Sequence, residues 1–465
     1  MRIPLLNERL RPAKPTFNAE EIMLRANALF RAEQSQDLGP VIAEKIEELR
    51  HYDVLGMDRV AAILSWGRSG SVLLSSYLDG HEDVLILPEL GGEKLYSFFD
   101  SYQSLPWSDK LLAYAAFEPN NPRFFEGNFA ISSARYYAAV QAIIECYRKW
   151  TPEFLQSRRA FFLFVHIAYT LALGRRPASS HPLIVYAQHA RNDEVARRFV
   201  EDFPQAKFIH TIRDPLSSCD ANFHYFLGTV TKDFPRTYTL TPYWAIFYLT
   251  DKDRPHSGME SRTRTVRFED LQRETGQTLR DLSDWLGLSY QATLLDSTFN
   301  GIPYVVKRDG QAWSGRRPEQ AQRNLRYIPP KDRALLFAFF YQNLVDWNYP
   351  CPKIFGYVIV RWIVFLSLVL FPMKMETVAA RGVLKGWTLP LLRQGKIWGA
   401  IKSLLGMGFY RLKIIRLLVP VFFQRCVHRT TLLQVDHKTC PSEPRDVHGS
   451  TVLPDSTTLI TKSKP

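Results

Sequence analysis

Short apolar runs alternate with helical patterns through the middle of the chain. Runs that lack polar alternation fit strands buried on both faces, and strands that alternate with helices indicate a parallel sheet. The sequence therefore predicts an α/β domain of three layers, with helices on both faces of a parallel sheet. The five expected strands are Val60 to Leu64, Val84 to Leu87, Leu183 to Ala187, Lys207 to Ile212 and Arg264 to Phe268, and the clearest helix between them is Asp193 to Asp202.

The same pattern divides the chain into four parts. Helical periodicity at Ala19 to Phe30 and Val41 to Leu49 predicts a helical N-terminal cover over residues 1–55. We expect the α/β domain at 56–350 and a segment of basic, apolar helices at 351–430. The remainder, 431–465, is polar and rich in Ser, Thr and Pro, which predicts a disordered tail.

The first expected strand runs into a glycine-containing loop and a helix. Gly67 and Gly70 allow a sharp turn and a close approach to a ligand, Ser71 is placed to cap the helix, and Gly80 is placed to end it in the left-handed conformation. The unpaired N–H groups of the helix start and the guanidinium of Arg68 together indicate a site for a phosphate-like anion. The sheet is thus expected to be P-loop-like, but GxxxxGK[ST] is absent from this loop.

Two further chemical groups follow expected strands. Arg213 comes directly after Lys207 to Ile212, where it could bind a second phosphate or simply be solvated. Glu89 follows the second strand, where it could act in catalysis or cap the turn after it. Ligands of open parallel sheets bind beyond the carboxyl ends of the strands, so both residues are expected at the binding edge.

Charge and cysteine content narrow the possible classes of protein. The formal net charge is +13, of which residues 351–430 carry +12, because they hold thirteen Lys or Arg and one acidic residue. A nucleic-acid coat over the whole domain is therefore not expected. The five cysteines are widely spaced and form no CxxC pair, which predicts a reducing compartment and no metal site. The first residues contain no apolar stretch that would serve as a signal peptide or anchor.

The basic segment contains two apolar stretches. The run from Trp362 to Met373 is too short for the ~20 residues that a membrane-spanning helix needs. A span that includes Arg361 would carry a penalty of roughly 3 kcal/mol at mid-membrane. Ile397 to Phe423 mixes large apolar residues with Lys402, Arg411, Lys413 and Arg416, which is typical of an amphipathic helix in the interface of an anionic bilayer. Residues 353–423 are therefore expected to contact a membrane peripherally, although ordinary helices packed on the domain are the alternative.

Two stretches resemble sulfotransferases that use 3′-phosphoadenosine-5′-phosphosulfate. GRSGSVLLSSYLDGHEDV is similar to the loop that binds the 5′-phosphosulfate, and FPQAKFIHTIRDP is similar to the segment whose arginine binds the 3′-phosphate. The closest likeness is to the branch with tyrosylprotein and many bacterial sulfotransferases. The resemblance covers about 61–350 and implies that the cosubstrate is bound by Arg68, Ser69, Gly70, Ser71, Val72 and Arg213.

The resemblance also implies roles for more scattered residues. Glu89 matches the catalytic base of that branch, and Arg68 would also stabilise the leaving phosphate. His189 is an alternative base that matches no family motif. Phe268 matches an aromatic residue near the adenine, and Arg316 or Arg317 would reach the 3′-phosphate from a basic loop.

The sequence departs from the family pattern at two places. Ala221 stands where the family has a serine, so Ser217, Ser218 or Asn222 would supply the second donor, and we assign Ser218. The branch's lysine is not evident, and Gln188 or His189 occupies its place.

The function that this resemblance implies is transfer of a sulfuryl group to a hydroxyl or amine. The acceptor is expected to be an alcohol or glycolipid reached at a membrane. We expect the enzyme to be cytoplasmic and peripheral to the membrane, and to bind neither a metal nor a nucleic acid. The alternatives are a non-catalytic nucleotide-binding protein of the same fold at a membrane, and a P-loop phosphotransferase.

Overall fold

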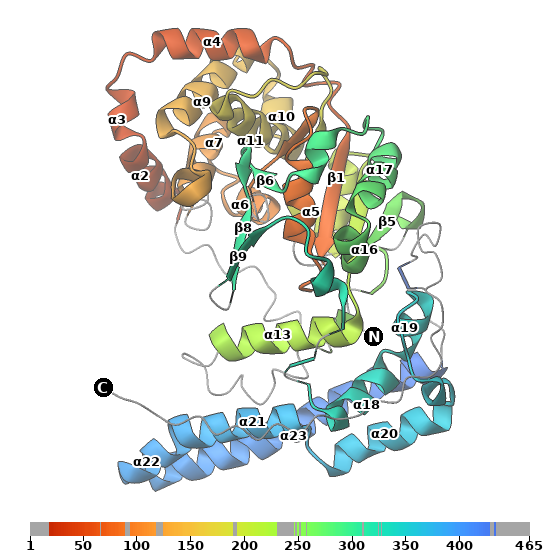
Figure 1. The fold of residues 1–465 in the computed structure, drawn as a ribbon. Helices are drawn as coiled ribbons and strands as arrows, with labels where there is room; N and C mark the ends of the chain where they lie inside the picture. The colour runs from red at the N-terminus through yellow and green to blue at the C-terminus, as the bar shows by residue number, and fades with distance from the viewer. Residues whose placement is uncertain are drawn as a thin grey trace, which may run out of the picture. The chain divides into compact units, whose positions relative to one another are not determined.

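Five parallel strands form the central sheet of this chain in the computed structural model (Figure 1). They are β1 (Val60–Ser65), β2 (Val84–Ile86), β3 (Leu183–Gln188), β4 (Lys207–Ile212) and β5 (Thr263–Arg267), in the spatial order β2-β3-β1-β4-β5. The structure describes residues 18–65, 67–88, 94–117, 124–188, 193–229, 246, 249–250, 253–256, 258–308, 311–323, 325–326, 328–427 and 432–433. The predicted parallel sheet is confirmed.

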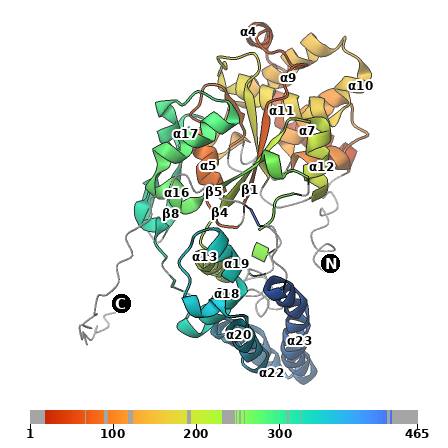
Figure 2. The ribbon, with the colours of Figure 1, turned by 90° about the vertical axis from the view of Figure 1, so that its right-hand side faces the viewer.

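Alternate residues of the strands enter two different cores. Val60, Ala62 and Leu64 of β1 join one core, whereas Ala61 and Ile63 join the other. Because successive side chains of a strand point to opposite faces, both faces of the sheet are buried. Figure 2 shows the resulting layers, with α5, α16 and α17 on one side of β1 and α7, α11 and α12 on the other. The three-layer prediction is therefore confirmed.

The larger core is built around α11 (Arg158–Leu173), which is buried along nearly its whole length. This helix begins at Ser157, whose hydroxyl accepts from the Ala160 N–H at 3.1 Å, and ends at Gly174 in the left-handed conformation, with φ of 70°. The other helices with residues in this core are α2 (Ala19–Leu29), α4 (Gly39–Leu49), α6 (Leu95–Ser101), α7 (Trp107–Ala116), α9 (Ser133–Tyr147), α10 (Pro152–Leu155) and α12 (Asp193–Asp202). The predicted N-terminal helices are thus present as α2 and α4, with α3 (Arg31–Gln34) between them.

The opposite face is covered by α5 (Ser71–Leu78), α16 (Phe268–Arg273) and α17 (Thr275–Leu286). The strand expected to run through Phe268 ends at Arg267 instead, and Phe268 begins α16. Acidic residues in the first turn of α16, Glu269 and Asp270, favour a helix start there. Two antiparallel hairpins follow, namely β6 (Thr298–Phe299) with β7 (Ile302–Pro303), and β8 (Val305–Arg308) with β9 (Gln311–Ser314).

A third core joins α13 (Pro215–Thr229) to the C-terminal helices. These helices are α18 (Pro330–Phe339), α19 (Tyr341–Asp346), α20 (Val358–Leu370), α21 (Lys374–Val383), α22 (Leu389–Arg393) and α23 (Ile397–Val427). No helix in the described part of the chain is long and apolar enough to cross a membrane. Leu432 and Leu433 fall inside the predicted tail yet are buried, and the other residues of that tail lie outside the described ones. The proposed domain boundaries stay predictions.

Candidate active site

The loop between β1 and α5 turns through three residues in the left-handed region. Gly67 has φ of 92°, Arg68 of 53° and Gly70 of 87°, and Gly70 is the N-cap of α5. The prediction that Ser71 caps the helix is wrong, because Ser71 is already its first helical residue and no side chain caps this end. The first N–H groups of α5 therefore have no side-chain acceptor, which is the arrangement that anion sites at helix starts use.

Contacts from neighbouring elements hold this loop in place. The Gly67 N–H donates to Ser65 Oγ at 3.1 Å, and the Ser69 and Thr211 hydroxyls lie 2.9 Å apart. The Ser218 hydroxyl of α13 donates to the Gly67 carbonyl. Arg68 alone among the loop's described residues has an exposed side chain. A non-glycine residue at positive φ costs about 1–2 kcal/mol, so these contacts stabilise a conformation that presents the Arg68 side chain outward.

Gly70 is required by packing as well as by conformation. A Cβ on Gly70 would lie 2.6 Å from Cδ2 of Phe268. Phe268 is buried, and its ring supports the guanidinium of Arg213 at 4.5 Å from the ring centroid. Phe268 therefore packs against the loop, and its assignment to the adenine stays a prediction.

Arg213 lies beside the loop and follows β4 directly. Its Nη1 donates to the Arg68 carbonyl at 3.3 Å. The parallel register explains this proximity, because Ser65 of β1 pairs with Thr211 of β4, and Ile212 pairs with Arg267 of β5. The loops after β1, β4 and β5 therefore meet at one edge of the sheet. The structure thus brings together the two basic groups that the sequence assigned to two phosphates.

A buried carboxylate that the sequence reasoning missed fixes the turn that carries Arg213. Glu269 accepts from the Asp214 N–H at 3.0 Å through Oε1 and from the Tyr349 hydroxyl at 2.6 Å through Oε2. Burial raises the pKa of Glu269, and the two hydrogen bonds oppose the rise. The available signal was a carboxylate next to the end of a buried strand, but Tyr349 is distant in sequence and could not be paired with it.

The Asp214 carboxylate completes this turn. Its Oδ1 accepts from the Ser217 N–H at 2.8 Å, which caps α13, and its Oδ2 accepts from Arg323 Nε at 3.0 Å. The possible substitutes for the family serine at Ala221 lie one turn further on. Ser218 is bonded to the loop, and Asn222 donates to the Ser218 carbonyl at 2.8 Å. Ser218 therefore contacts the loop backbone, and its assignment as the second donor stays a prediction.

Arg316 and Arg317 are engaged elsewhere. Arg316 donates to the carbonyls of Gln272 at 3.0 Å and Arg273 at 2.7 Å, where it caps the end of α16. The guanidinium of Arg317 bonds to Glu319 and lies 4.4 Å from the centre of the Trp313 ring. Their assignment to the 3′-phosphate stays a prediction that requires these contacts to rearrange.

The remaining predicted site residues lie in the first turn of α5 or outside the described residues. Ser71 is buried and Val72 half-buried in the first turn of α5. Glu89 and His189 lie outside the described residues, so both proposed bases stay predictions. No group of three or more metal-ligating side chains occurs among the residues that the structure describes.

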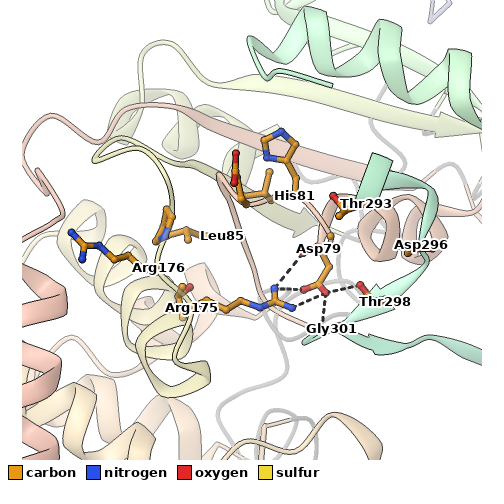
Figure 3. Close-up of a pocket in the computed structure, with 14 residues that line it drawn as sticks. Asp79, His81, Leu85, Arg175, Arg176, Thr293, Asp296, Thr298 and Gly301 are labelled. Atoms are coloured by element: carbon orange, nitrogen blue, oxygen red, sulfur yellow. Dashed lines mark hydrogen bonds and ion pairs between the residues drawn. The ribbon is translucent and has the colours of Figure 1, made fainter. Parts of the chain in front are cut away.

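A cavity of about 380 Å³ lies at the opposite edge of the sheet, where β2 and β3 begin (Figure 3). Asp79 closes one side of it. This carboxylate receives two bonds from Arg175, at 3.0 and 3.2 Å, and a third from the Thr298 hydroxyl at 3.0 Å. The charges of Asp79 and Arg175 are thus paired with each other. The cavity also lies away from the carboxyl ends of the strands, where ligands of such sheets bind.

Gly80 lines this cavity, and the prediction of its left-handed conformation is wrong. Its φ is not positive, and α5 ends through bonds from the N–H groups of Gly80 and His81 to carbonyls three residues back. A glycine is needed here for another reason. A Cβ would lie 2.5 Å from the carbonyl oxygen of Thr293, so the residue permits a close backbone approach.

Part of the chain matches a known protein family. Residues 61–292 match the model of the Sulfotransferase family. No curated protein sequence matches the chain significantly.

Solved structures with some likeness are also sulfotransferases. The sulfotransferase domain from the curacin biosynthetic pathway is 18% identical over 51% of this chain and 76% of its own, with a TM-score of 0.28. The sulfotransferase domain of the Synechococcus PCC 7002 olefin synthase is 20% identical over 51% and 76%, with a TM-score of 0.27. Sulfotransferase STF9 from Mycobacterium avium is 11% identical over 61% and 87%, with a TM-score of 0.30. Scores this low leave the fold to be judged from the strand order itself.

Proposed function

Since residues 61–292 of this enzyme belong to the sulfotransferase family, we propose that it transfers a sulfuryl group from 3′-phosphoadenosine-5′-phosphosulfate to a hydroxyl or amine. The observation that carries the donor assignment is the pairing of the uncapped start of α5 with Arg213 at one sheet edge. This arrangement offers backbone N–H groups and two guanidiniums to a ligand with two phosphates.

Each of these groups has a role in holding the donor. The N–H groups of Ser69 to Val72 and the Arg68 guanidinium suit the 5′-phosphosulfate, where they would neutralise the charge that grows on the leaving phosphate. A preorganised donor of this kind contributes about 3 kcal/mol to transition-state stabilisation. Arg213 suits the 3′-phosphate, and Phe268 keeps its guanidinium in place. The donor, when bound, supplies the sulfuryl group that is transferred.

The acceptor must lose a proton during transfer. Glu89 is proposed as the general base that takes this proton, a role that a carboxylate side chain can perform. The proposed acceptor is an alcohol, lipid or glycolipid presented at a membrane, which would suit the composition of the C-terminal helices. The cytoplasmic location expected from the cysteines stays a prediction.

A thermal-shift titration with 3′-phosphoadenosine-5′-phosphate tests the donor site. A ligand at a hundredfold excess over its dissociation constant stabilises by about 2.7 kcal/mol, so a clear rise in Tm is expected. ATP with Mg²⁺ serves as the comparison, because a phosphotransferase would prefer it.

Two variants and a matched control make the test specific. Arg68→Ala and Arg213→Ala should each lose most of the shift, whereas Arg31→Ala, which removes an exposed arginine of α3, should retain it. Alanine meets the same backbone strain as arginine at position 68, so that variant isolates the guanidinium. A shift with ATP and Mg²⁺ alone, or one retained in both variants, would reject the assignment. Donor turnover with simple alcohols then tests catalysis directly.

A further inference from the structure

The C-terminal helices expose most of the large apolar side chains found on the protein surface. Of the 27 exposed large apolar residues among those described, 21 lie between 351 and 427. Soluble monomers rarely expose contiguous apolar patches larger than a few hundred Å². Helix α23 contacts both α20 and α22, and Figure 1 shows these two helices toward opposite ends of it.

Helix α20 exposes apolar side chains and buries its charged one, which is the reverse of an ordinary surface helix. Its single charged residue, Arg361, is 7% exposed, with the guanidinium 4.8 Å from the centre of the Tyr341 ring. Four aliphatic side chains of this helix are 53–73% exposed and recur with helical spacing: Ile359, Ile363, Leu366 and Leu370. Val358 and Ser367 are also exposed. A helix in water normally buries its apolar stripe and exposes its charges. Here the exposed stripe is apolar.

Helix α23 carries a second stripe over its whole length. Exposed side chains recur every three or four residues, at Trp398, Ile401, Leu405, Phe409, Leu412, Arg416, Val419 and Phe423. The opposite side of the helix packs on α20, where the rings of Phe365 and Phe422 stack at 4.1 Å. The two helices bury their facing sides against each other. Phe423 lies at the margin, 6.0 Å from the Trp362 ring, and the side chains of both stripes remain exposed.

The charges on this segment are of one sign at the surface. Its only acidic residue, Glu376, is 5% exposed and pairs with Arg411 at 3.0 Å. Seven basic residues of the same segment are exposed: Lys353, Arg381, Lys385, Arg393, Lys396, Lys402 and Arg416. Exposed tryptophans accompany them, Trp387 at 49% and Trp398 at 82%. Indole rings are favoured at the boundary between water and lipid.

Internal contacts fix this surface to the enzyme. Arg425 of α23 is buried and paired with Asp253, and it also donates to the Asn343 side chain at 2.7 Å. The Trp347 indole donates to the Leu433 carbonyl at 2.8 Å. The segment is therefore built into the fold, and a ligand of its outer surface would hold the whole enzyme.

We propose that residues 353–423 form a docking surface for an anionic lipid bilayer, in which α20 and α23 lie in the interface. The stripes would enter the boundary of the acyl chains while the exposed cations meet lipid phosphates. A second copy of this surface would bring cation against cation, and a nucleic acid would leave the apolar stripes in water. The proposal is independent of the sulfotransferase chemistry, because vesicle binding requires no turnover.

Flotation of the full chain with vesicles tests the proposal. We expect strong binding to phosphatidylcholine vesicles that contain phosphatidylserine and weak binding to phosphatidylcholine alone. Leu405→Gln with Leu412→Gln removes two side chains that are 70% and 67% exposed, and should weaken partitioning about 100-fold. The matched control is Leu24→Gln with Leu55→Gln, at 63% and 60% exposure outside the segment, which should change nothing.

Charge variants and a solution measurement complete the test. Lys402→Gln and Arg416→Gln should each weaken binding to anionic vesicles roughly fivefold. Equal binding to both vesicle types, or unchanged binding in the Leu405→Gln, Leu412→Gln protein, would overturn the proposal. So would a concentration-dependent dimer that the same double variant abolishes, if vesicles bind neither protein. A thermal unfolding transition within a few degrees of that of the natural protein in every variant shows that the fold is intact.

Discussion

Replacement of Glu269 should show how much this buried carboxyl group stabilises the turn that carries Arg213. In Glu269→Leu, the Asp214 N–H and the Tyr349 hydroxyl lose their acceptor inside the protein. Each buried donor left without a partner costs about 1–3 kcal/mol, so the free energy of unfolding should fall by about 2–6 kcal/mol. Glu269→Gln retains an acceptor for the Asp214 N–H and should cost less than about 1.5 kcal/mol.

Guanidinium unfolding followed by tryptophan fluorescence measures both variants. The matched control is Glu145→Leu, which replaces an exposed glutamate of α9 and should lie within about 0.5 kcal/mol of the natural protein. Calorimetric titration with 3′-phosphoadenosine-5′-phosphate should show roughly tenfold weaker binding in Glu269→Leu, because the turn that presents Arg213 loses its support. A leucine variant as stable as the Glu145→Leu protein, with unaltered affinity, would refute this reasoning.

The pH dependence of stability gives an independent check on the same residue. Because burial raises the pKa of Glu269, the folded protein retains this proton at a pH where the unfolded chain has lost it. Stability from this group is therefore fully present below the unfolded pKa and declines as pH rises through the folded pKa. The difference in unfolding free energy between the natural protein and Glu269→Gln should decline over that range. A difference that grows with pH would contradict the direction of the shift.

Two other substitutions test packing and a buried ion pair. Gly70→Ala combines a positive φ with a Cβ contact of 2.6 Å to Phe268, and should lower the free energy of unfolding by about 2–4 kcal/mol in thermal unfolding. The matched control is Gly395→Ala, which has a φ of 70° but open space around it and should cost only about 1–2 kcal/mol. Equal losses would show that the Phe268 ring moves freely. Arg425→Gln removes the closest cation from the buried Asp253, which retains the Asn343 amide at 3.1 Å and Arg254 at 3.8 Å, and should destabilise by about 3–5 kcal/mol. Adding Asp253→Asn should restore part of that loss, and a double variant no better than the single one would argue against a coupled pair.

Local features of the sequence were enough to predict the sheet and the sharp turn between β1 and α5. Strand burial on both faces follows from uninterrupted apolar runs, and the glycines at 67 and 70 mark a turn whatever surrounds them. Arg213 could be expected near this loop because parallel strands present their carboxyl ends at one edge. These predictions succeed because they depend on backbone geometry and on neighbours close in sequence.

Contacts between distant parts of the chain decided the rest. Gly80 is a glycine because the Thr293 backbone approaches it, and Glu269 is held by Tyr349, eighty positions away. Composition alone indicated that the C-terminal helices are basic and apolar, but only their packing shows that Arg361 is buried while the aliphatic stripe is exposed. The physical reason is that burial belongs to a whole assembly of elements, so the side of a helix that meets water is settled only when its neighbours are in place.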